Sequence, residues 1–124
     1  MRTLGIQVRL RRLLRVAAES AERVAAEPSN RGLAAASVAR LLVICGEVRQ
    51  AWNRESAGLR AAAGELGTVQ KSVARSLSAV EALVAELELP GADALRLWAE
   101  LQDTVVPLIY VLRGLEEPNL ARTA

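Results

Sequence analysis

Apolar residues recur every three or four positions through most of this chain, and this spacing limits what it can fold into. The spacing is that of amphipathic helices with one apolar face each, and the alternation typical of a half-buried strand occurs nowhere. Hydrophobic residues make up 52% of the chain, yet aromatic residues make up only 2% and phenylalanine is absent. Alanine, leucine and valine must therefore fill the core, and the first two are the best apolar helix formers.

Turn signals divide the pattern into four helices. We expect them over residues 3–27, 33–66, 69–87 and from 92 or 93 to 113. Residues 28–32 read as a loop and residues 89–91 as a turn, because both contain proline and glycine. Between the second and third helices, we expect Gly67 to act as a C-terminal cap and Thr68 as an N-terminal cap.

Four helices of similar length pack naturally as a bundle. The predicted fold is therefore all-α, a four-helix up-down bundle that forms a single domain over residues 1–115. Gly114 should end the fourth helix, which leaves a short C-terminal tail over residues 116–124. Pro107 lacks a backbone donor and should kink the same helix.

The boundary between the second and third helices allows another interpretation. The apolar spacing continues in phase from Leu41 to Leu87, and two glycines inside a helix would cost only about 1 kcal/mol each. The two segments could then fuse into one helix about 70 Å long, at about 1.5 Å per residue. Such a rod would dimerise as a coiled coil, because its own chain could not cover it. We favour separate helices, since they give four elements of similar length.

The residue inventory excludes most enzyme classes. Histidine is absent and Cys45 is the single cysteine, which removes the commonest general base and the commonest metal ligand. Glu86 and Glu88 point to different faces of a helix, and Gln70 replaces the glycine that a phosphate loop needs before Lys71. We therefore expect no enzyme, no metal and no cofactor, and a buried, inert thiol at Cys45.

Charge is unevenly distributed, although the formal net charge is only +2. Every charged residue up to Ala18 is an arginine, and several fall on the face opposite the apolar stripe of the first helix. Trp52 lies on an apolar stripe, which predicts a core anchor, but polar neighbours also make it a candidate interface residue. The candidate interaction surface consists of Arg9, Arg11, Arg12, Arg15 and Trp52.

The leading hypothesis is a non-enzymatic helical module for protein–protein interaction: an adaptor, a regulatory subunit or an assembly subunit that also self-associates. It follows from the missing chemistry and from Leu42, Val43 and Ile44, which spread apolar area beyond one helix face. The first alternative is a membrane-surface bundle that uses the basic first helix. The second is a nucleic-acid-associated subunit, which the scarcity of aromatic side chains for base stacking disfavours.

The sequence also predicts a location. A single cysteine indicates a reducing environment, no secretory signal is evident, and no apolar run approaches the length of a membrane span. We therefore expect a cytoplasmic protein, and the preference for arginine over lysine suggests a GC-rich, bacterial genome.

Overall fold

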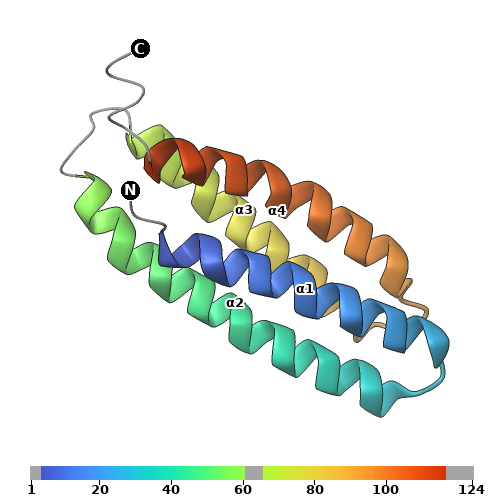
Figure 1. The fold of residues 1–124 in the computed structure, drawn as a ribbon. Helices are drawn as coiled ribbons and strands as arrows, with labels where there is room; N and C mark the ends of the chain where they lie inside the picture. The colour runs from blue at the N-terminus through green and yellow to red at the C-terminus, as the bar shows by residue number, and fades with distance from the viewer. Residues whose placement is uncertain (1–3, 61–65, 117–124) are drawn as a thin grey trace.

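The computed structural model describes residues 4–60 and 66–116, which form four helices that run alternately up and down a bundle (Figure 1). The helices are α1 (Gly5–Ala26), α2 (Arg31–Arg60), α3 (Leu66–Glu86) and α4 (Ala94–Glu116). The described residues contain no strand. The predicted all-α, four-helix up-down bundle is therefore confirmed.

The helices pack as a closed ring around one core. α1 and α3 each contact both α2 and α4, and the apolar stripe of every helix points inward. The core is built almost entirely from aliphatic side chains, as the composition requires. Its largest fully buried members are Ile6, Leu10, Leu13, Ile44, Leu112, Val16, Val48, Val73, Val80 and Val105.

α2 and α3 are separate, antiparallel neighbours, so the alternative of one fused helix is wrong. Arg49 Nη2 and Glu81 Oε1 form an ion pair 2.6 Å apart across the two helices. In a continuous helix these residues would lie about 48 Å apart, at about 1.5 Å per residue. Gln70 Nε2 also donates a hydrogen bond, at 3.5 Å, to the Ser56 carbonyl oxygen.

The caps predicted between α2 and α3 are wrong. Gly67 and Thr68 lie inside the first turn of α3, which begins at Leu66. Gly67 therefore does not follow the last residue of α2, and Thr68 does not precede the first residue of α3. The other expected bounds shift less: α1 begins at Gly5 rather than Thr3, a residue that is itself outside the described part.

The two turns at the opposite end of the bundle use side-chain caps. Asn30 Oδ1 accepts a hydrogen bond from the Leu33 amide at 3.0 Å, so α2 begins two residues earlier than expected. Asp93 Oδ1 accepts one from the Arg96 amide at 3.1 Å and so caps α4. Between α3 and α4, Gly91 has a φ of 76°, the left-handed conformation that glycine adopts without strain.

The predicted end of α4 at Gly114 is wrong, because α4 continues through Pro107 and Gly114 to Glu116. A glycine that ends a helix usually adopts positive φ, and among the described residues Gly91 alone does so. Of the expected tail over residues 116–124, only Glu116 belongs to the described part, where it is the last residue of α4.

Candidate functional site

The predicted arginine cluster lies on the outer face of α1. Arg11, Arg12 and Arg15 are exposed, as expected, whereas Arg9 is half-buried and donates a 3.2 Å hydrogen bond to the Gly5 carbonyl oxygen. Arg12 Nη1 lies 3.5 Å from Glu47 Oε2 on α2, and both side chains are substantially exposed. Within the described residues, Arg15 makes no hydrogen bond or ion pair. Three charges of this cluster therefore face solvent.

Trp52 does not join this cluster. Only 5% of its surface is exposed, and it belongs to the core between the helices. This burial agrees with the interpretation of Trp52 as a core anchor and leaves almost no surface for a partner. Two of the polar neighbours that suggested an interface residue, Asn53 and Arg54, are exposed on other faces of α2, because successive helical positions are rotated by about 100°. The third, Arg49, pairs with Glu81 of α3.

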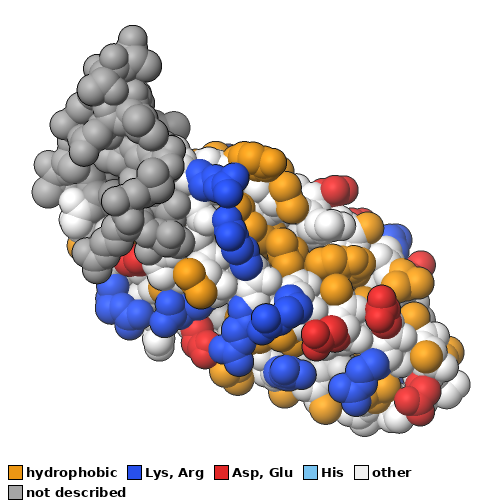
Figure 2. All heavy atoms as spheres, viewed as in Figure 1, with side chains coloured by type: hydrophobic (Ala, Val, Ile, Leu, Met, Phe, Trp, Pro, Cys, Tyr) orange, Lys and Arg blue, Asp and Glu red, His pale blue; other side chains and the backbone are white. Residues whose placement is uncertain are grey.

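Exposed apolar residues also lie on α4, and this surface was not predicted from the sequence. Leu95 is 52% exposed, Val106 36% and Tyr110 66%. These three residues lie 11 and 4 positions apart, a spacing that places them on one side of the helix, away from the core stripe. In Figure 2 hydrophobic side chains line α4 and its border with α1, and arginine side chains lie beside them. Exposed apolar residues that share one side of a helix can mark an interaction surface.

We call this combined surface the α1–α4 face. It consists of Arg11, Leu14 and Arg15 on α1 and of Leu95, Asp103, Val106 and Tyr110 on α4. Leu14 is half-buried and packs against the core at the border between the two helices. Asp103 is exposed and, like Arg15, has no ion pair among the described residues. The face thus combines an apolar centre with two charges, Arg15 and Asp103, that have no ion pair within residues 4–60 and 66–116.

Gln7, which sequence analysis missed, lies beneath this face. Its side chain is 1% exposed, and its Oε1 atom accepts a 3.0 Å hydrogen bond from Arg11 Nη2. Its Nε2 atom is the one buried side-chain nitrogen or oxygen of the described residues without a hydrogen-bond partner. A buried amide with an unmade hydrogen bond destabilises a fold, so Gln7 orients Arg11 at a cost in stability.

We expect Gln7→Leu to raise the unfolding free energy by about 1 kcal/mol, because it removes the unpaired donor and keeps a similar volume. For a chain of this length, that gain would raise the melting temperature by about 3–5 °C. Thermal denaturation followed by circular dichroism measures it. The matched control, Gln50→Leu at an exposed position on α2, should give no comparable gain. A clear loss of stability in Gln7→Leu would contradict this account of Gln7.

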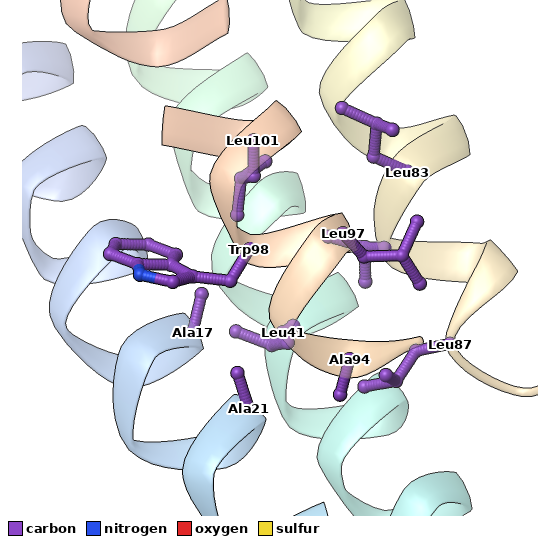
Figure 3. Close-up of a pocket in the computed structure, with 10 residues that line it drawn as sticks. Ala17, Ala21, Leu41, Leu83, Leu87, Ala94, Leu97, Trp98 and Leu101 are labelled. Carbon is purple, nitrogen blue, oxygen red and sulfur yellow. The ribbon is translucent and has the colours of Figure 1, made fainter. Parts of the chain in front are cut away.

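The apolar hollow between the helices is too small for a cofactor. A cavity of about 30 Å³ is lined by residues of all four helices, including Leu41 of α2, and Trp98, Leu97 and Leu101 of α4 form one side of it (Figure 3). Trp98 projects from α4 over Ala17 and Ala21 of α1, which leave room for its ring. Such a volume holds about one or two water molecules, and its lining is apolar. It is a packing gap rather than a binding site.

A larger hollow of about 590 Å³ lies at the end of the bundle, between the α1–α2 and α3–α4 turns. Its charged residues include Arg31, Glu88 and Asp93. Asp93 already caps α4, and the charges of both signs give the hollow no clear preference for a ligand.

The described residues offer no candidate metal site. They include no group of three or more histidine, cysteine, aspartate or glutamate residues that could hold a metal ion. Cys45 is buried, and desolvation raises the pKa of its thiol to about 11, with a smaller contribution from Glu81. The thiol is therefore neutral and shielded at physiological pH, which makes it a poor nucleophile.

Comparison with known proteins assigns this chain to no family. No family model, no curated protein and no solved structure matches this chain. Across the helices described, none is both long and apolar enough to cross a membrane. The function must therefore be argued from the surface of the bundle itself.

Proposed function

We propose that this chain is a non-enzymatic helical module for protein–protein interaction, an adaptor, regulatory or assembly subunit that also self-associates. The observation that carries the proposal is the α1–α4 face, where Leu95, Val106 and Tyr110 are exposed beside the unpaired charges of Arg15 and Asp103. Protein interfaces typically join an apolar centre, often with tyrosine and arginine, to a polar rim.

The rest of the molecule supports an interaction role. The core is complete without the α4 stripe, since every helix already buries its own apolar face. The exposed apolar residues are therefore not left over from a failure of packing. The unpaired, buried Cys45 is compatible with the reducing, cytoplasmic setting that we propose.

We expect the purified chain to self-associate reversibly, so that its average mass rises with concentration in light scattering coupled to size exclusion. Val106→Glu combined with Tyr110→Glu should shift the equilibrium towards monomer by at least about tenfold, because the change buries charge in the apolar centre. Its melting temperature should hardly change, since both positions are exposed. The matched control is Leu89→Glu, which adds one charge at an exposed leucine in the α3–α4 turn.

The proposal would be contradicted if the wild-type chain stays monomeric at every concentration and also captures no protein that the double variant fails to capture.

A membrane surface is the alternative. Arg11, Arg12 and Arg15 beside apolar residues would also suit anionic lipid, where each basic residue contributes about 1 kcal/mol to binding. Binding of the monomer to anionic lipid vesicles at low salt, in place of self-association, would favour that alternative instead.

A further inference from the structure

We propose that a second copy of this chain docks on the α1–α4 face with the two α4 helices parallel, so that Asp103 of each copy meets Arg11 and Arg15 of the other. The twofold axis runs along the helices. This inference rests on the self-association proposed above and specifies its surface and geometry.

The apolar centre of the α1–α4 face can pack against the α4 helix of a second copy. Leu95 and Tyr110 lie 15 positions apart, which is about 23 Å of α4 at about 1.5 Å per residue, and Val106 lies between them on the same side. The half-buried Leu14 of α1 extends the apolar surface towards the neighbouring helix. A second α4 placed against this stripe buries its own stripe in the same contact, as a twofold interface requires.

Asp103 and the α1 arginines lie on opposite sides of the apolar stripe of α4. Trp98 faces α1, because it lies over Ala17 and Ala21 (Figure 3). Five positions later, at about 100° per residue, Asp103 points about 140° away from Trp98, on the side of the stripe remote from α1. The basic side of the face is therefore on α1, and Asp103 marks its other side.

The same charges lie at one level along the bundle. α1 and α4 run antiparallel (Figure 1). A step of five residues forward along α4 from Trp98 therefore reaches the same height in the bundle as a step of five residues back along α1 from Ala17 and Ala21. This step places Asp103 level with the segment between Arg11 and Arg15.

These positions favour the parallel arrangement. A twofold axis along the helices preserves level and brings the Asp103 side of one copy to the α1 side of the other, so Asp103 meets Arg11 and Arg15. An axis that is perpendicular to the helices and passes through the middle of the stripe would instead join like sides and reverse level about that point. It would therefore place the α1 arginines of the two copies together. Like charges brought together oppose association, and opposite charges at an interface set its orientation.

Charge reversal tests the pairing. We expect Asp103→Arg to weaken self-association by roughly tenfold in sedimentation equilibrium, because two symmetric contacts each change from attraction to repulsion. Arg11→Asp with Arg15→Asp should weaken it similarly, and combining all three changes should restore it. Glu88→Arg is the matched control, since it makes the same change in charge at an exposed residue in the α3–α4 turn. Circular dichroism of each variant checks the fold.

A cysteine tests the orientation independently. The parallel axis places Val106 of the two copies opposite each other, so Val106→Cys should form a disulfide-linked dimer under mild oxidation, whereas Val43→Cys on α2 should not. The pairing is overturned if the combined reversal fails to restore association or if Val106→Cys stays unlinked. If Val43→Glu disrupts the dimer in place of the α4 changes, the copies use another face, and the proposed interaction function stands without this geometry.

Discussion

Replacing Leu10 with alanine should remove about 2–5 kcal/mol from the unfolding free energy, the usual cost of a cavity in place of a buried leucine. Leu10 is 0% exposed and lies in the core, on the inward face of α1. A chain of this length has a total stability of roughly 6–18 kcal/mol, so this one change can remove a large share of it. Urea denaturation, followed by the fluorescence of Trp52 and Trp98 at a concentration that favours monomer, measures the loss.

Val8→Ala is the matched control for that experiment. Val8 lies two positions earlier on the same helix but is 57% exposed, so its truncation should change the unfolding free energy by no more than about 0.5 kcal/mol. Similar losses in the two variants would contradict the described orientation of α1, because they would require both faces of that helix to be buried.

The fold was predictable from the sequence because the helical spacing of apolar residues is enough to define the core. The spacing of Ile6, Leu10 and Leu13 assigns the inner face of α1 without any tertiary information, and all three are fully buried. The same spacing correctly places Arg11 and Arg15 in solvent. An aliphatic helical core follows from periodicity alone, since every helix contributes one stripe to one shared interior.

The helix ends were less predictable, because local signals there compete with packing. Glycine is a common helix terminator, yet Gly67 and Gly114 both lie inside helices. A single helical glycine costs only about 1 kcal/mol, and contacts between neighbouring helices can outweigh that cost. The Arg49–Glu81 ion pair shows the same limit, since a contact between residues 32 positions apart cannot be read from local pattern.

Half of the candidate site could also be predicted. The arginines of α1 stand out in the sequence, but the α4 part of the face does not, because its exposure depends on which sides of α4 the other helices cover. One signal was available: Leu95, Val106 and Tyr110 are out of phase with the core stripe of α4. Trp52 shows the reverse, since residue type suggested an interface, whereas the packing of α2 buries the ring.

The beginning of α1 depends on a side chain from another helix, and its loss should be the second large effect. The Glu55 carboxylate on α2 accepts hydrogen bonds from the backbone amides of Gly5 at 2.6 Å and Ile6 at 2.8 Å. These amides have no partner within their own helix. A Cβ atom at Gly5 would lie 2.9 Å from Arg9 Nη1, so the flexible Arg9 side chain would have to shift, whereas its distance of 3.4 Å from Glu55 Oε2 would be an ordinary contact.

We expect Glu55→Ala to lower the unfolding free energy by about 1–3 kcal/mol, because two charge-assisted hydrogen bonds disappear and two half-buried amides lose their acceptor. The negative charge also lies at the positive end of the α1 dipole. Glu55→Gln should lose less, since it keeps one acceptor oxygen. Amide hydrogen exchange should quicken at Gly5 and Ile6 before it quickens in the rest of α1. Glu47→Ala, which removes only the exposed contact with Arg12, should cost less than about 1 kcal/mol, and an equal cost would show that Glu55 acts as an ordinary surface charge.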